Sequence, residues 1–283
     1  MIKNPHIREK IAFTFLFIAT AIVVLPVIFI FGYIIAKGYS AISWEFFTQM
    51  PTRGMREGGI FPAIIGTLYL VLGTLVFALP LGVLTAIYLT EYAKDNWFTR
   101  TVKLAIINLA GVPSVVFGLF GLGVFVMFLK FGASILAGSL TLAIMVLPII
   151  ITTTREALDS VPQSFRQVSM ALGVSRWDTI RHVVLPNAMP GILTGMILAI
   201  SRAAGETAPI LFTVAAFYLP KLPKSVMDQV MALPYHLYVI STQVPNIKPQ
   251  VRYGTALVLL MIVLSVNLAA IILRSYFRKK KKW

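Results

Sequence analysis

Arg202 and Glu206 are the residues best placed to do chemistry, because they lie inside an otherwise apolar run of the sequence. A charge at the centre of a bilayer costs about 2.5–3.5 kcal/mol on insertion scales, so charged residues found there usually have a function. The two residues are four positions apart and lie on one helix face, so their side chains can pair. The planar fork of an arginine suits the oxygens of an oxyanion, and a neighbouring carboxylate would keep a bound anion from being held too tightly. We therefore predict that both residues line the path of an anion; the alternative is a structural pair that orients the helix inward.

A polar, charge-rich segment just before this pair has the signals of a short capped helix. Gly173 can adopt the left-handed conformation that ends a preceding helix. Ser175 can cap the next helix, and Asp178 lies three residues on, as in a capping box. We expect this helix to end at Leu185–Pro186, so that Asn187 caps the apolar run that follows.

The capped helix would present Arg176 and Trp177 on its surface. One interpretation is an amphipathic helix that lies on the membrane, with Trp177 among the lipid headgroups. The other is a rigid docking helix that offers both side chains to the groove of a partner protein. The residues alone leave these two alternatives open.

The elements that must position these residues are membrane-spanning helices. The 283 residues are 58% hydrophobic and only 12% charged, and the mean hydropathy is +0.86. A helix needs roughly 20 apolar residues to cross a bilayer. Six uncharged runs approach or exceed that length: Ile11–Ala36, Ile60–Thr90, Leu104–Leu129, Phe131–Thr154, Val183–Ser201 and Tyr253–Leu273. We therefore predict an all-α, polytopic membrane protein with about six transmembrane helices.

The distribution of Lys and Arg predicts how the spans are oriented. With the N-terminus in the cytoplasm, sixteen of the 25 fall inside, eight outside, and Arg202 within a span. The inside residues are Lys3, Arg8, Lys10, Lys94, Arg100, Lys103, Arg155, Arg166, Arg176, Arg181, Arg274, Arg278 and Lys279–Lys282. This bias predicts that both termini are cytoplasmic. The net charge of +15 then needs no nucleic acid, since the C-terminal basic run suits an anchor to lipid headgroups.

The chain divides into two unequal parts. We expect residues 1–59 to form an N-terminal transmembrane helix and an outer loop, and residues 60–283 a transmembrane domain with an inside loop near 155–186. The first span follows a basic segment, as a signal peptide does, but it is too long for one. Prolines in the outer segment Tyr218–Arg252 argue against a long helix there.

Residues 173–186 resemble the cytoplasmic loop signature of ABC importer permeases. That signature is a glycine, nine variable residues, an apolar residue, one more residue and then Leu-Pro. Gly173, Val183 and Leu185–Pro186 fill these positions. The family often has Glu-Ala-Ala shortly before the glycine, where this chain has Gln167–Ser169, so the resemblance implies no carboxylate role at position 167.

Three more stretches resemble the A-type permease subunit of phosphate-specific ABC importers. They are Leu81–Ala93 (LGVLTAIYLTEYA), Gly111–Gly123 (GVPSVVFGLFGLG) and Ser201–Phe212 (SRAAGETAPILF). The resemblance runs from about Ile60 to the C-terminus. It implies the ABC importer permease fold in the inner membrane and a phosphate path that includes Arg202. A permease for another oxyanion, such as molybdate or sulfate, is the alternative, because one arginine cannot choose among tetrahedral anions.

The same resemblance implies a set of partners. They are a homologous second permease subunit, an extracytoplasmic phosphate-binding protein and two ATP-binding subunits on the cytoplasmic side. The residues expected to couple to the ATP-binding subunits are Gly173, Ser175, Arg176, Trp177, Val183, Leu185 and Pro186. Glu206 is expected beside Arg202 on the solute path.

Two other classes of function are disfavoured by the motifs. The sequence has no cysteine, no GxxxxGK phosphate loop, no His-Glu-x-x-His and no nucleophile elbow. A membrane-embedded phosphatase would need clustered catalytic groups, and a passive channel would leave the capped helix without a purpose. We expect a transport subunit rather than an enzyme, with no cofactor or metal and with ATP hydrolysis on a separate chain.

Overall fold

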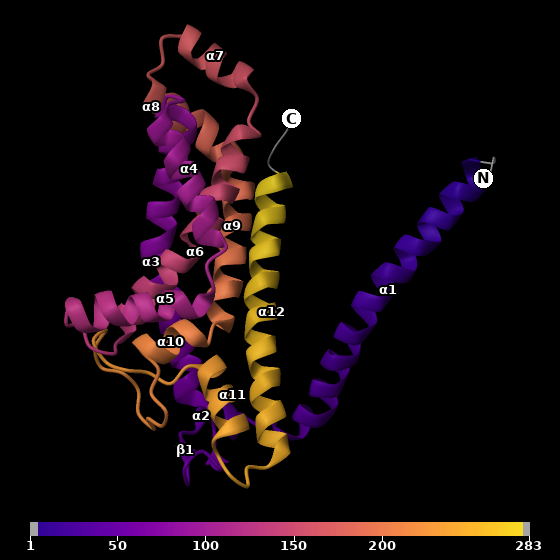
Figure 1. The fold of residues 1–283 in the computed structure, drawn as a ribbon, viewed down its shortest axis with the longest axis vertical. Coiled ribbons are helices and arrows are strands. Elements are labelled where there is room, and N and C mark those ends of the chain that lie inside the picture. The colour runs from indigo at the N-terminus through magenta and orange to yellow at the C-terminus, as the bar shows by residue number, and fades with distance from the viewer. Residues whose placement is uncertain (1–4, 280–283) are drawn as a thin grey trace.

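The computed structural model describes residues 5–279 and shows a helical bundle with one helix standing apart (Figure 1). Lys3 and Lys280–Lys282, which belong to the predicted inside charges and lipid anchor, lie outside the described residues. Five described helices are long and apolar enough to cross a membrane. They are α1 (Pro5–Gly38), α3 (Phe61–Ile87), α6 (Ile135–Asp159), α9 (Leu185–Gly205) and α12 (Pro249–Lys279). The predicted all-α membrane fold is confirmed, with one small strand pair, β1 (Pro51–Thr52) and β2 (Glu57–Gly58), in the described part.

The predicted third span, Leu104–Leu129, is a sharply bent pair of helices. It consists of α4 (Trp97–Ala110) and of α5 (Ser114–Gly121), which a π-helical turn extends to Phe128, and the two parts meet at 105°. Pro113 lies between them in an extended conformation, with ψ 140°. A proline has no N–H to donate and disfavours a helical residue before it, so the helix stops there. In Figure 1, α5 crosses the bundle instead of running along it.

The core of the bundle forms where α6 packs between α3 and α9. Leu142, Val146 and Ile150 of α6 are fully buried in this core. Small residues let the helices approach closely. Gly191 and Gly195 of α9 lie against Ala157 and Thr153 of α6.

One end of the bundle is built from short elements, one of which, the loop before α11, covers the start of α6. These are a 3-10 turn (Tyr39–Ala41), α2 (Trp44–Thr48), the loop before α11 and α11 itself (Leu233–Thr242). The carbonyls of Val226 and Asp228 in that loop accept hydrogen bonds from the N–H groups of Leu136 and Ile135, both at 2.9 Å. These bonds satisfy donors that the first turn of a helix leaves unpaired. As predicted, the outer segment carries no long helix, since α11 has ten residues.

The other end of the bundle carries the predicted inside loop, with α7 (Gln163–Ala171) and α8 (Arg176–Thr179). Helix α8 does not stop at Leu185–Pro186 as predicted. It continues through a π-helical turn (Ile180–Val184) into α9, so that Arg176–Gly205 is one 30-residue helix. Pro186 comes directly after this π-helical turn, inside the continuous helix. Asn187 caps nothing, because its side-chain amide donates to the Val183 carbonyl at 2.7 Å inside the helix.

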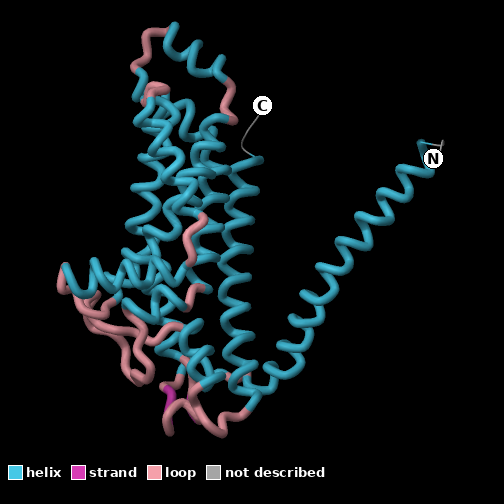
Figure 2. The backbone as a smooth tube through the Cα atoms, viewed as in Figure 1, coloured by secondary structure: helices cyan, strands magenta, loops and turns pink. Residues whose placement is uncertain are grey.

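Helix α1 stands apart from the rest of the bundle (Figure 2). It meets α12 near its C-terminal end, where the rings of Tyr33 and Tyr253 pack edge to face with centroids 5.5 Å apart. Most of its other apolar side chains are exposed. Its start and the end of α12 both lie toward the end of the molecule that carries α7 and α8. An apolar surface this large must be covered by lipid or by another protein chain.

Candidate functional site

Arg202 and Glu206 form the predicted ion pair, but they do not share one continuous helix. Arg202 Nε lies 3.4 Å from Glu206 Oε1, and the two side chains are 32% and 17% exposed. Helix α9 ends at Gly205, and Glu206 is extended, with φ −75° and ψ 135°. The pair therefore closes across the end of the helix, where α9 is interrupted and the short α10 (Ala208–Thr213) begins.

The break in this helix has a local cause. Pro209 lies in the first turn of α10, where its missing N–H is tolerated and where it cannot extend the hydrogen-bond ladder of α9. Unwound backbone at membrane depth is tolerated where it is buried in protein or lines a cavity, and transporters often place their solute sites at such breaks. A side chain built at Gly205 would meet no other atom within 4 Å, so the backbone beside Arg202 borders open space.

Two neighbouring contacts hold the break in place. The Ser201 hydroxyl donates a hydrogen bond to the side-chain oxygen of Asn267 in α12, so the two helices are joined beside the break. On the other side, Gly118 of α5 lies against Ala208, Pro209 and Phe212, close enough that a side chain there would collide with them. The sequence stretches 111–123 and 201–212, which carried the resemblance separately, thus pack against each other.

The capped loop has the predicted local geometry. Gly173 has φ +78°, a conformation that favours glycine. The Ser175 hydroxyl accepts a hydrogen bond from the Asp178 N–H at 3.1 Å, as an N-cap should. Trp177 is 47% exposed, while Val183 and Leu185 are partly buried and Pro186 is exposed. Trp177 is therefore available to a partner, although its contact with one stays a prediction.

Arg176 is already used by its own chain. Its guanidinium donates to the backbone carbonyl of Glu91 and lies over the ring of Tyr92, 5.1 Å from the centroid. These contacts tie the start of α8 to the end of α3. Both side chains proposed for docking are exposed, but Arg176 is bonded to its own chain.

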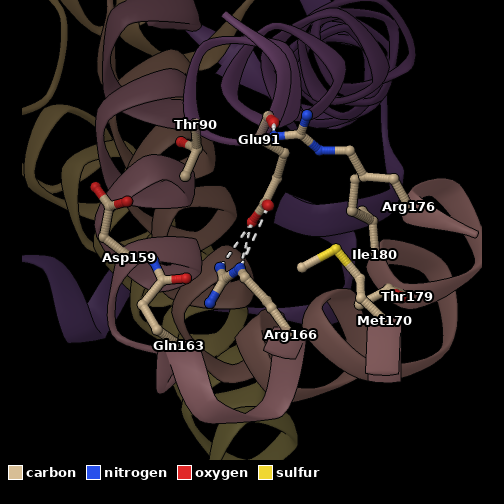
Figure 3. Close-up of a pocket in the computed structure, with 9 residues that line it drawn as sticks. All are labelled: Thr90, Glu91, Asp159, Gln163, Arg166, Met170, Arg176, Thr179 and Ile180. Carbon is tan, nitrogen blue, oxygen red and sulfur yellow. Dashed lines mark hydrogen bonds and ion pairs between the residues drawn. The ribbon is translucent and has the colours of Figure 1, made fainter. Parts of the chain in front are cut away.

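A buried ion pair at the same place was not expected from the sequence. Glu91, in a π-helical turn after α3 (Tyr88–Tyr92), binds Arg166 of α7 at 2.6 Å between Oε1 and Nη2. Both side chains are less than a tenth exposed. The pair lines a cavity of about 400 Å³ (Figure 3). The sequence gives no sign of this pair, because no local pattern links residues 75 positions apart.

Comparison with known proteins places the chain among transport proteins. A family model described as the binding-protein-dependent transport system inner membrane component matches residues 78–283. The probable ABC transporter permease protein YqgI of Bacillus subtilis (strain 168) is 34% identical over 291 residues, which is 98% of each chain. The phosphate transport system permease protein PstA 1 of Mycobacterium tuberculosis (strain ATCC 25618 / H37Rv) is 34% identical over 282 residues, 98% of this chain and 91% of the relative.

Solved structures show the same fold at lower identity. A bacterial ABC transporter involved in the import of the acidic polysaccharide alginate matches 98% of this chain and 100% of its own, with TM-score 0.68 and 13% identity. The inward-facing MetNI methionine ABC transporter matches 77% of this chain and 97% of its own, with TM-score 0.59 and 15% identity. Since these two carry different solutes, their likeness concerns the fold and not the substrate. With the family model and the full-length relatives, they show that this chain belongs to the family of inner membrane permease components of binding-protein-dependent ABC importers.

Proposed function

We propose that this chain is a permease subunit of an ATP-driven phosphate importer. The observation that carries the proposal is Arg202, a partly exposed arginine at a helix break beside open space, held by a single carboxylate. Arginine binds phosphate oxygens through a planar fork of N–H groups. Glu206 competes for the same fork, so that a bound anion can also leave. The similarity to phosphate transport permeases over nearly the whole chain supports phosphate as the anion.

A second, homologous permease chain completes the path in this proposal. Arg202 and Gly205 face open space within one chain, so a single subunit does not enclose an anion. The bare apolar surface of α1 also needs a cover. An extracytoplasmic binding protein would deliver phosphate to the end that carries α2 and α11. Two ATP-binding subunits would dock at the opposite end, on α7 and α8.

Movement of the docked loop reaches the solute path through one helix. The helix Arg176–Gly205 carries Trp177 near its start and Arg202 near its end. At about 1.5 Å per residue, roughly 38 Å of helix separates these two residues. When the ATP-binding subunits close, the α8 end moves with them and the far end of the same helix reorients Arg202. This is the rocking of helices around a central site that alternating access requires.

Uptake by the assembled importer in vesicles tests the proposal. The permease chains and ATP-binding subunits are reconstituted with binding protein outside and ATP within, and radiolabelled phosphate is followed. We expect ATP-dependent phosphate uptake that a tenfold excess of sulfate or molybdate does not reduce. Uptake of sulfate or molybdate in preference to phosphate would support the other-oxyanion alternative and reject phosphate as the substrate.

A further inference from the structure

Hydrogen bonds of Glu91 and Arg166 bring four segments of the chain together. The carboxylate of Glu91 binds the Arg166 guanidinium from α7, with Nε–Oε1 at 3.1 Å and Nη2–Oε1 at 2.6 Å. The backbone carbonyl of Glu91 accepts from Arg176 at the start of α8. The remaining N–H groups of Arg166 donate to the carbonyls of Leu158 and Val161, at 2.9 and 2.8 Å, where α6 ends. Glu91 and Arg166 together therefore join the ends of α3 and α6 to both helices of the loop.

These bonds pair the charges of Glu91 and Arg166 in a place that water hardly reaches. Arg166 satisfies the carboxylate of Glu91 and two carbonyls at the end of α6, where a helix leaves acceptors unpaired. Glu91 and Arg166 neutralise each other, and water has little access to either side chain. A buried pair with this many partners fixes one relative arrangement of its helices, because any slippage would leave a charge unpaired.

The backbone on both sides of the network is irregular. Glu91 lies in the π-helical turn Tyr88–Tyr92, and a second π-helical turn, Ile180–Val184, follows α8. Single π-helical turns within longer helices occur frequently at functional sites. Here they are the points at which α3 and α9 pass from the membrane bundle into the loop region. The bonds of Glu91 with Arg166 and Arg176 lie between these two turns.

The connectivity of the chain makes this contact necessary for α3. Helix α9 is continuous with α8, and α6 is joined to α7 by the short segment 160–162, so both follow the loop through the backbone. Helix α3 has no such connection, because α4 and α5 separate it from α6 along the chain. Yet α3 packs along α6 and also contacts α9, so it must move with them if the bundle is to rock as a unit. The bonds at Glu91 connect the end of α3 to α7 and α8, beside a buried apolar cluster that includes Leu89, Ile180 and Val184. Among these contacts the hydrogen bonds are the directional ones.

We propose that Glu91 and Arg166 are a positioning pair that makes α3 follow the loop 155–186, so that ATP hydrolysis moves the whole bundle and not α9 alone. This inference rests on the proposed function for its transport readout. Without the pair, the partner ATPase would still hydrolyse ATP and move α8, while α3 lagged behind. The expected defect is hydrolysis without proportionate transport, rather than loss of the protein.

The decisive variants separate this coupling role from simple stability. Glu91→Gln alone leaves the Arg166 charge buried and unpaired, which destabilises any fold. The double variant Glu91→Leu with Arg166→Met removes both charges and leaves none behind, so it should assemble at the wild-type level. Asp95→Asn is the matched control, because it breaks an ion pair with Arg100 in the neighbouring segment whose two members are both exposed.

The first measurement is phosphate uptake per ATP hydrolysed by the reconstituted importer complex. We expect this ratio to fall about fivefold or more in the double variant, the lower bound of typical coupling between sites, and to stay at the wild-type value in Asp95→Asn. A double variant that assembles with an unchanged ratio would overturn the inference. Arg166→Lys, which keeps the charge but loses the fork, should give an intermediate ratio.

The second measurement needs no substrate and therefore stays informative even if the proposed function fails. The chain has no cysteine, so exposed Tyr88 and Val168 can be replaced by cysteines and spin-labelled at the end of α3 and on α7. In otherwise wild-type complexes, we expect one narrow distance distribution that is the same without nucleotide and with trapped ATP. In the double variant the distribution should broaden or shift with ATP. A narrow, unchanged distribution in the double variant would show that α3 follows the loop without the pair.

Discussion

Among single residues, Arg202 is a charge inside the bundle that is paired loosely and stays partly exposed. It lies in the last turn of α9, where the helix dipole favours a positive charge. Its one ion-pair partner in the described structure, Glu206, is held at 3.4 Å, longer than a strong charge-assisted bond of about 2.7–2.9 Å. Glu91 and Arg166 are the opposite case, since they are buried and closely bonded. We interpret the loose pair as part of the solute path and the tight pair as part of the framework.

The first prediction concerns the charge of Arg202. Arg202→Gln keeps polarity but removes the charge, and hydrogen bonds to charged groups are worth about 1.5–3 kcal/mol. Phosphate uptake by the reconstituted importer should therefore fall roughly 10- to 100-fold, while ATP hydrolysis persists. Arg202→Lys should recover part of the uptake, because a point charge lacks the two-pronged geometry.

A matched control for this variant is Arg53→Gln. Arg53 also pairs with a glutamate four residues on, Glu57 at 2.8 Å, but both side chains are exposed at the end that carries α2. We expect wild-type uptake from it. Full uptake in Arg202→Gln at the wild-type protein level would instead favour a structural ion pair.

At the scale of elements, the structure is governed by where helices are allowed to stop. Pro113 ends the apolar run of α4 and turns α5 across the bundle, and Pro209 accompanies the break after α9. Pro186 has the opposite outcome, because a π-helical turn before it carries α8 into α9. The first two prolines build the surroundings of Arg202. The third leaves a continuous helix between the loop and Arg202.

The second prediction concerns the loop helix. Gly173 has φ +78°, and a side chain there would meet nothing within 4 Å, so only backbone strain opposes substitution. Gly173→Val should cost about 1–3 kcal/mol in the loop and uncouple the ATP-binding subunit, whereas Gly173→Asn should be tolerated because asparagine adopts this conformation more readily. Trp177→Ala should reduce co-purification of the ATP-binding subunit without reducing membrane insertion. Wild-type co-purification and uptake in both Gly173→Val and Trp177→Ala would reject docking through this helix.

The third prediction concerns the loop that covers the start of α6. The backbone N–H groups of Lys224 and Ser225 donate to the Asp228 carboxylate at 2.7 and 3.0 Å and hold its pKa below the ordinary value. A lowered folded-state pKa means that this contribution to loop order is fully present above the ordinary value and is lost as pH falls through the folded-state value. Hydrogen exchange should show faster exchange in residues 224–228 of Asp228→Ala at neutral pH. In the wild type, the same loosening should occur only under strongly acidic conditions; an equal loosening at pH 6 would contradict this assignment.

For the whole molecule, the arrangement of the helix ends shows which segments share one side of the membrane. Helix α1 begins and α12 ends toward α7 and α8, while α2 and α11 lie at the opposite end (Figure 1). The start of α1, the end of α12 and the loop 155–186 thus share one side, and which side is cytoplasmic stays a prediction. The arrangement also leaves one side of α1 uncovered, which fits a subunit that is complete only in an assembly.

The fourth prediction tests this orientation by cysteine labelling. Ser43 is unsuitable for replacement, because its hydroxyl caps α2 by accepting from the Phe46 N–H at 3.2 Å. Gln49 and Gln167 are exposed at opposite ends of the molecule, and the chain has no other cysteine. An impermeant thiol reagent added outside intact cells should label Gln49→Cys and leave Gln167→Cys unlabelled until the membrane is opened. The reverse pattern would invert the proposed topology.

The sequence by itself determined the features that depend on neighbouring residues. Apolar runs long enough to span a bilayer predict the helices, because the energy of burying backbone in lipid is set by local composition. The cap at Ser175 and the left-handed Gly173 follow from residues two to four positions apart. The proximity of Arg202 and Glu206 also followed from their spacing.

Only the tertiary structure decided which distant residues meet. The pairing of Glu91 with Arg166 spans 75 positions, and Arg176 reaches Glu91 across 85. A proline alone also did not determine where a helix ends, since Pro113 follows the end of α4 and Pro186 lies within a continuous helix. Local propensities of about 1–3 kcal/mol can be outweighed by the packing contacts and hydrogen bonds that helices make with each other in a membrane. The packing of the helices therefore determines which local signals take effect. It also brings Arg166 and Arg176 to Glu91.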